Sequence, residues 1–228
     1  RPLPDATPFE SPPSLRTTLD TRDGPIGGMG ISEGVTLITG GGFHGKSTLL
    51  AALQWGHRDH VPGDGRERVV SDPDTVKVRA EDGRRVERVD VSAFLRELPG
   101  GRSTRPLCTD DASGSTSQAA ALVEAVEAGA RVLLMDEDTC ATNLMVSDAT
   151  MRALIGAHRE PITPLVDRIR DIHAQWGVST ILVVGGVGDY LAVADRVLLM
   201  DAWRPTEVTE RARALAHHLT TKNTKHTS

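Results

Sequence analysis

A glycine-rich octapeptide stands between an apolar, β-branched run and a helical pattern. Its members fit the pattern GxxxxGK[ST] at every position: Gly40, Gly41, Gly42, Phe43, His44, Gly45, Lys46 and Ser47. The run Val35–Thr39 precedes it, and Leu49, Leu50 and Leu53 follow at helical spacing. Glycines let backbone N–H groups turn inward around phosphates, and the start of the next helix favours negative charge. The order strand, loop, helix predicts a phosphate-binding loop, the alternative being a plain glycine-rich turn.

Three neighbouring residues at the end of this loop have the side chains that a nucleoside triphosphate needs. Lys46 is expected to reach the β and γ phosphates, so we count it as catalytic as well as nucleotide-binding. The Ser47 hydroxyl is expected to ligate Mg²⁺. Thr48 completes the predicted nucleotide-binding segment.

Two carboxylates follow a continuous apolar run at 132–135, which is typical of a buried parallel strand. Asp136 and Glu137 would emerge at the carboxyl edge of the sheet, where ligands of open α/β sheets bind. This is a Walker B pattern. We expect Asp136 to hold Mg²⁺, directly or through water, and Glu137 to orient or deprotonate the attacking water. A solvated acidic loop is the alternative.

A Ser- and Gly-rich segment precedes the helix that leads into this strand. Small residues at a helix start can offer N–H and hydroxyl donors to a γ phosphate, so Ser113, Gly114 and Ser115 are further nucleotide-binding candidates. An ordinary Ser/Thr helix cap explains the same residues.

The pattern of elements predicts an α/β sandwich. Apolar runs at 132–135, 181–184 and 197–200 read as central strands, and helical stripes cover 115–128 and 165–176. The β-like stretches 75–79 and 85–89 flank an Asp-Gly turn signal and predict an antiparallel hairpin. We expect a flexible lead-in at 1–30, a core domain at 31–219 and a disordered tail at 220–228.

Bulk composition indicates a cellular compartment but does not identify a binding partner. The formal net charge of −5 gives no global attraction to nucleic acid or membranes. Two widely spaced cysteines, Cys108 and Cys140, suit small buried side chains in a reducing compartment. No apolar run approaches the length of a membrane span. The expected location is cytoplasmic.

The order of these motifs resembles that of ABC-type ATPases, whose LSGGQ signature occupies the position of residues 112–118 and is matched in part. The segments GGGFHGKST, HVPGDGRE, DASGSTSQA, LLMDEDTCATN and VVGGVGDY are similar to the soluble predicted ATPases of the ABC class. The resemblance implies a P-loop NTPase fold with a mainly parallel sheet and an antiparallel β subdomain. It also implies ATP and Mg²⁺ as ligands and a head-to-tail homodimer around ATP, in which Ser113 and Gly114 of one chain cap the γ phosphate of the other.

The sequence departs from ordinary ABC cassettes where their switch histidine stands. Residues Val184–Asp189 contain no histidine, so Gly186–Asp189 either replaces the switch or forms a plain turn. His57, Arg58, Asp59, His60 and Asp64 lack a recognised metal-ligand spacing and read as a surface loop.

Clustered basic residues suggest a second hypothesis for the function. Arginine and lysine side chains at 66, 68, 77, 79, 84, 85 and 88 make the predicted hairpin region locally basic. The alternative function is therefore a nucleotide-gated nucleic-acid (RNA) binding module with weak hydrolysis. A solvated charged surface would explain the same residues, because acidic residues intervene and no aromatic side chain stands among them.

Overall fold

A computed structural model describes residues 5–98, 101–147, 156 and 160–225. Its strands are β1 (Arg16–Thr21), β2 (Gly24–Met29), β3 (Val35–Gly40), β4 (Thr75–Lys77), β5 (Arg84–Val89), β6 (Leu107–Ala112), β7 (Val132–Asp136), β8 (Ser179–Val183), β9 (Arg196–Asp201) and β10 (Arg204–Glu207). Its α-helices are α1 (Lys46–Trp55), α2 (Gly114–Glu127), α3 (Thr142–Met145), α5 (Leu165–Trp176) and α6 (Thr209–Lys225). The short 3₁₀ turns are η1 (Pro13–Leu15), η3 (Glu137–Thr139) and η4 (Gly188–Ala192).

Six strands form a mixed, mostly parallel sheet in the order β10-β9-β3-β8-β7-β4. Strand β3 runs parallel to β9, β4 runs parallel to β7, and the edge strand β10 is antiparallel to its neighbour β9. Two further antiparallel pairs, β1-β2 and β5-β6, stand outside this sheet. The predicted central strands at 132–135, 181–184 and 197–200 correspond to β7, β8 and β9, so the expected α/β architecture is confirmed.

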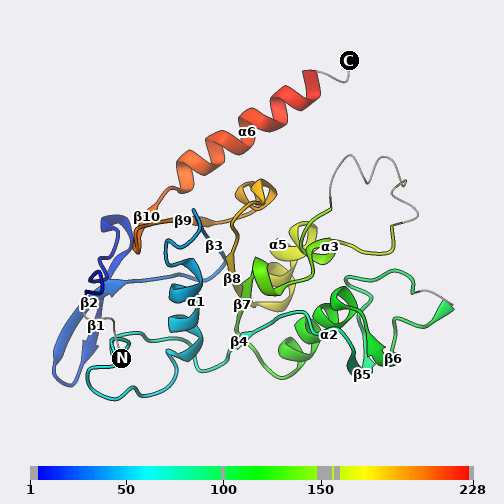
Figure 1. Ribbon diagram of the computed structural model, residues 1–228, viewed down its shortest axis with the longest axis horizontal. Helices are drawn as coiled ribbons and strands as arrows, with labels where there is room; N and C mark the ends of the chain where they lie inside the picture. The colour runs from blue at the N-terminus through cyan, green and yellow to red at the C-terminus, as the bar shows by residue number, and fades with distance from the viewer. Residues whose placement is uncertain (1–4, 99–100, 148–155, 157–159, 226–228) are drawn as a thin grey trace. The chain divides into compact units, whose positions relative to one another are not determined.

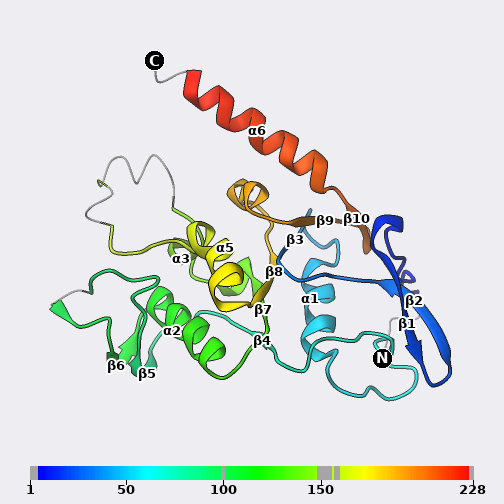
Figure 2. The ribbon, with the colours of Figure 1, turned by 180° about the vertical axis from the view of Figure 1, so that it is seen from behind.

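Contacts divide the chain into two compact units: unit 1 comprises residues 1–73 and 181–228, and unit 2 comprises residues 74–180. The single core domain over 31–219 stays a prediction from the sequence. In unit 1, Val35, Leu37 and Ile38 of β3 are almost completely buried, and α1 packs beside this strand (Figure 1). Helix α6 follows β10 and contacts β9 and η4 (Figure 2).

The two ends of unit 1 are more ordered than the sequence predicts. Residues 16–29, expected to be part of a flexible lead-in, form the β1-β2 hairpin, with Arg16 opposite Met29 and Thr21 opposite Gly24. Backbone pairing supplies the order, because most side chains of this hairpin are exposed. Helix α6 continues to Lys225, through most of the segment expected to be a tail.

In unit 2, α2 packs on β5, and α3 contacts α5 (Figure 1). The helical stripes at 115–128 and 165–176 are confirmed as α2 and α5. The predicted hairpin between 75–79 and 85–89 is wrong. Strand β4 pairs with β7, whereas β5 pairs with β6, so the turn at Gly83 joins two different sheets. A local turn signal cannot show which distant strand supplies the hydrogen bonds.

Candidate phosphate-binding and acidic sites

The loop between β3 and α1 has the backbone shape that its glycines predict. Gly40 has a φ of 141° and Gly45 a φ of 91°, both of which disfavour residues with a side chain. A Cβ atom on Gly40 would lie 2.3 Å from the Met200 carbonyl oxygen, and one on Gly45 would lie 2.6 Å from the Trp203 ring. Space as well as conformation therefore requires glycine at both positions.

Helix α1 begins where the loop ends. The Leu49 N–H donates to the Gly45 carbonyl at 2.9 Å, so the N–H groups of Lys46, Ser47 and Thr48 precede the helical hydrogen-bond ladder. Such N–H groups and the positive end of the helix dipole favour an anion at this position. Lys46 Nζ donates to the carbonyls of Gly40 and Gly41 at 2.8 and 2.6 Å, which holds its ammonium group across the loop.

Phe43 combines a strained backbone conformation with an exposed side chain. Its φ of 62° lies in the left-handed region, where a bulky side chain costs about 1 kcal/mol or more. Its side chain is 99% exposed, so packing within the chain does not compensate for that cost. Strained backbone of this kind is concentrated at functional sites.

The His44 side chain makes contacts that the sequence does not predict. The Ala202 N–H donates to His44 Nδ1 at 2.9 Å, and Asp201 Oδ1 lies 2.9 Å from the same nitrogen. The Trp203 N–H donates to the His44 carbonyl at 3.2 Å. Sequence reasoning missed Asp201, Ala202 and Trp203, because no local motif connects them with the loop.

Strand β7 places the two predicted carboxylates at its carboxyl end. Asp136 is its last residue and is 4% exposed, and Oδ1 accepts a 3.3 Å hydrogen bond from the Asp138 N–H. Glu137 is half-buried and begins η3. A buried carboxylate followed by a more accessible one is the arrangement expected for a metal ligand beside a base.

The three candidate residues at the start of α2 differ in exposure and in hydrogen bonding. Ser113 is the exposed N-cap, and its hydroxyl donates to Thr116 Oγ1 at 3.0 Å rather than capping the helix. Gly114 is half-buried, whereas Ser115 is 8% exposed. Ser113 and Gly114 therefore remain the better candidates for contact with a ligand.

A buried glutamine connects α2 with the segment that follows Glu137. Gln118 is fully buried; its Oε1 accepts a 2.7 Å hydrogen bond from the Ala141 N–H, and its Nε2 contacts Met145 Sδ at 3.4 Å. In the same segment, burial raises the pKa of the Cys140 thiol to about 12. Cys108 is exposed, so the prediction that both cysteines are buried is wrong for that residue.

The basic residues considered for nucleic-acid binding are largely paired with carboxylates. Ion pairs join Arg66 to Asp64, Arg79 to Glu81, Arg84 to Glu124, and Arg85 to Glu87 and Asp110. Paired charge of this kind favours the solvated surface over the nucleic-acid interface. In the predicted surface loop, the Arg66 hydrogen bonds lower the pKa of Asp64 to about 2.

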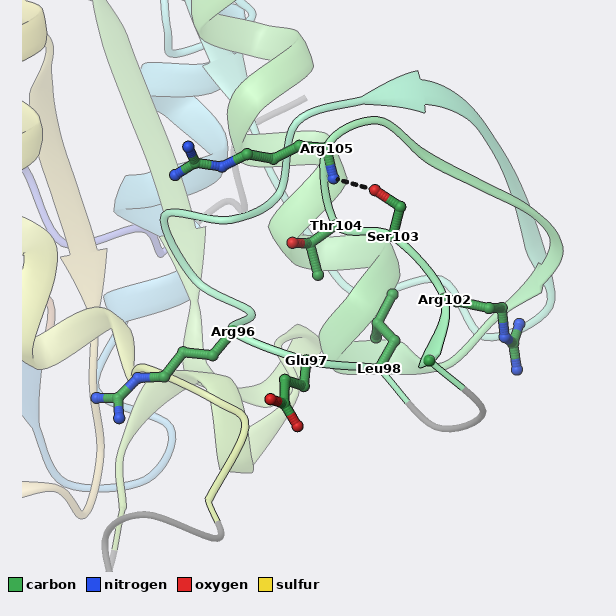
Figure 3. Close-up of a pocket in the computed structure, with 8 residues that line it drawn as sticks. Arg96, Glu97, Leu98, Arg102, Ser103, Thr104 and Arg105 are labelled. Atoms are coloured by element: carbon green, nitrogen blue, oxygen red, sulfur yellow. Dashed lines mark hydrogen bonds between the residues drawn. The ribbon is translucent and has the colours of Figure 1, made fainter.

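A cavity of about 650 Å³ lies elsewhere in unit 2 and is lined by residues 96–98 and 101–105. Figure 3 shows its arginines, with Arg102 projecting away from Arg96 and Arg105, and the Arg105 N–H donating to Ser103 Oγ. The three guanidinium groups do not converge on one point. None of its lining residues belongs to the predicted site, and their arrangement does not make an anion cradle.

Unit 1 thus gathers the predicted residues from Gly40 to Thr48 on one loop and helix start, and unit 2 contains the remaining candidates at the ends of β7 and α2. In the ranges that the structure describes, no group of three or more His, Cys, Asp or Glu side chains is arranged to hold a metal ion. None of the helices described combines the length and apolar character that a bilayer crossing demands.

Comparison with known proteins identifies the family. An uncharacterised protein of Methanocaldococcus jannaschii, MJ1628, is 30% identical over 199 residues, which make up 85% of this chain and 43% of the relative. The chain thus spans less than half of that protein's length.

Two solved structures share the fold. One is cbiO1 from Clostridium perfringens, part of the ABC transporter complex cbiONQ, with 17% identity, a TM-score of 0.50 and coverage of 82% of this chain and 83% of that one. The other is the ADP conformation of MJ1267, an ATP-binding cassette of an ABC transporter, with 15% identity, a TM-score of 0.50 and coverage of 83% and 86%. The model of the ABC ATPase P-loop domain matches residues 1–228. The chain belongs to the ABC ATPase P-loop family, and its fold is that of a P-loop NTPase.

Proposed function

We propose that this protein binds ATP with Mg²⁺ and hydrolyses it to ADP and inorganic phosphate. The observation that carries the proposal is the loop from Gly40 to Gly45, whose backbone leads into the N-terminus of α1 with Lys46 held across it. Membership in an ABC ATPase family supports the choice of ATP. A phosphate group at this position would meet N–H donors, a helix dipole and an ammonium group together.

The metal would be held by oxygen ligands. Mg²⁺ prefers carboxylate, hydroxyl and water oxygens, and the Ser47 hydroxyl and the Asp136 carboxylate would supply two of them. When bound with ATP, Mg²⁺ neutralises charge on the phosphate oxygens. The burial of Asp136 suits a ligand that must hold one orientation.

Glu137 is the residue we assign to water activation. It would accept a proton from water as the water oxygen bonds to the γ phosphorus and the bond from that phosphorus to the β–γ bridging oxygen breaks. Lys46 would stabilise the negative charge on the phosphate oxygens during this step. The products are ADP and inorganic phosphate.

A second copy of the chain would complete the site. Its family resemblance to head-to-tail cassettes suggests that Ser113, Gly114 and Ser115 of one copy face the γ phosphate bound by Lys46 of the other. Exposed Ser113 and half-buried Gly114 are the more suitable donors of the three. Positioning and charge stabilisation supply most phosphoryl-transfer catalysis, so an isolated monomer should hydrolyse ATP slowly.

The proposal is tested by measuring ATP binding and turnover for the wild type, Lys46→Ala and Glu137→Gln. Loss of the base should reduce turnover by about 10²- to 10⁴-fold while ATP binding persists, because the substitution leaves the phosphate loop intact. Lys46→Ala should weaken binding as well as turnover. The control is Glu127→Gln, which removes an exposed carboxylate at the end of α2 and should leave turnover unchanged. Turnover that none of these substitutions alters would contradict the assignment.

A further inference from the structure

Backbone strain in unit 1 is concentrated at two turns. Among the described residues, four that are not glycine have a positive φ, and three of them are Phe43, Ala202 and Trp203. Phe43 lies in the phosphate loop, and the other two form the turn between β9 and β10. Conformations of this kind persist where surrounding contacts hold them, often at ligand sites.

The β9-β10 turn has an unusual composition for its geometry. Asp201 pairs with Arg204, which leaves Ala202 and Trp203 as a two-residue connection with φ values of 45° and 63°. Hairpin turns with positive φ at both central residues strongly favour Asn-Gly or Gly-Gly. Trp203 is also 51% exposed, so burial of its indole does not explain its presence.

Both strained residues of this turn contact the phosphate loop through His44. The Ala202 N–H donates to the His44 side chain at 2.9 Å, and the Trp203 N–H donates to its carbonyl at 3.2 Å. On its other edge the His44 ring lies close to Gly41, because a Cβ atom there would be 3.2 Å from Cδ2. The imidazole therefore stands between the loop and the turn.

The indole of Trp203 makes a second connection. It lies so close to Gly45 that a Cβ atom there would be 2.6 Å from Cδ1. Gly45 is the N-cap of α1, directly before the N–H groups expected to bind phosphate. The turn thus touches the loop near its middle and at its end.

Nδ1 of His44 has a partner in the β9-β10 turn in either tautomer of the ring. It can accept the Ala202 N–H when it carries no proton, and it can donate to Asp201 Oδ1, 2.9 Å away, when it carries one. Both partners belong to the same turn.

We propose that His44 and Trp203 are positioning residues, which fix the phosphate loop in its binding shape by attaching it to the β9-β10 turn. One consequence is that ATP affinity depends on a turn that does not itself bind phosphate, and this consequence rests on the proposed function. A receptor already ordered before binding loses less conformational entropy when the ligand arrives.

The first test needs no nucleotide. Amide hydrogen exchange of residues 40–47 is compared in the wild type, His44→Ala, His44→Asn and Trp203→Gly, with folding of each checked by thermal melting. Glycine suits the positive φ at 203 and removes the whole Trp203 side chain, indole included. His44→Ala and Trp203→Gly should exchange faster by about tenfold, whereas the Asn oxygen can accept the Ala202 N–H and should restore protection. His57→Ala, an exposed histidine beyond α1, is the matched control.

The second test measures ATP affinity and turnover in the same proteins. His44→Ala and Trp203→Gly should raise the Kd and KM about tenfold with little change in kcat, since the reacting groups remain. Unchanged exchange and unchanged affinity in both variants would overturn the inference and leave the proposed function intact. Wild-type protein that does not bind ATP would overturn the proposed function and the effect on affinity, while faster exchange in the variants would still establish the attachment of the loop.

Discussion

Cys140 and Cys108 differ in environment, and that difference predicts their reactivity. Burial raises the pKa of Cys140 to about 12, so at pH 8 only about one molecule in ten thousand has the reactive thiolate at this position. Cys108 is exposed. Titration with a disulfide reagent should find one fast thiol in the folded protein and two after unfolding in guanidinium.

Two serine variants assign these thiols. Cys108→Ser should abolish the fast phase, and Cys140→Ser should leave it unchanged. Two equally fast thiols in the folded wild type would show that Cys140 is not protected by burial.

The lowered pKa of Asp64 predicts that the free energy of unfolding depends on pH, and a single substitution should remove this dependence. Arg66 donates two hydrogen bonds to its carboxylate, at 2.5 and 2.9 Å, and these bonds lower the pKa from 3.8 to about 2. Because the folded-state pKa is the lower one, the stabilisation is complete above about pH 4 and is lost as the pH falls toward 2. NMR titration of Arg66→Ala should find the pKa of Asp64 near its ordinary value.

Arg68→Ala is the control for that titration. Arg68 is an exposed arginine two residues further along, and the pKa of Asp64 does not depend on it. An Asp64 pKa that stays near 2 in Arg66→Ala would refute the role of the Arg66 hydrogen bonds.

Among the elements, α2 is joined to the segment after Glu137 by a buried polar side chain. Gln118 is fully buried and accepts the Ala141 N–H at 2.7 Å. Gln118→Ala would leave that N–H without its acceptor and open a cavity, so the free energy of unfolding should fall by about 1–3 kcal/mol in urea titrations. Gln175→Ala, at an exposed position of α5, should change it by less than about 0.5 kcal/mol. Equal effects of the two substitutions would contradict the role of Gln118.

Helices were easier to predict than strand partners. Helices α2 and α5 follow from apolar residues at helical spacing, because a helix makes its backbone hydrogen bonds within itself. The sequence predicts extended segments at β4 and β5 but pairs them with each other. Their true partners β7 and β6 lie elsewhere in the chain, and β-like composition carries no information about such pairing.

The β1-β2 hairpin illustrates a different failure. Pro25 and the glycines of β2 make the segment resemble a linker, since proline and glycine are rare in central strands. The pair stands outside the six-stranded sheet, and as a two-stranded hairpin it has only edge strands, where proline is tolerated. Residue composition therefore predicted flexibility where backbone pairing provides order.

For the whole molecule, the proposed two-chain site predicts that ATP turnover depends on protein concentration. Specific activity should rise with concentration at low protein, because donors from a second copy are needed for phosphoryl transfer. Glu137→Gln should form an ATP-dependent dimer in sedimentation experiments, since its nucleotide is bound and not hydrolysed. Lys46→Ala with ATP is the control and should remain monomeric. Constant specific activity together with a monomeric ATP-bound Glu137→Gln would exclude the two-chain site.

The sequence alone predicted the glycine-rich loop, the strand that ends at Asp136, and helices α1, α2 and α5, because these depend on backbone preferences and side-chain spacing within a few consecutive residues. Only the tertiary structure decided the partners of β4 and β5, the two-unit division and the attachment of His44 to Ala202, 158 positions away. Contacts of that range depend on how the chain folds back on itself. No local pattern in the sequence contains that information, and the neighbours of the phosphate loop therefore became known only with the fold.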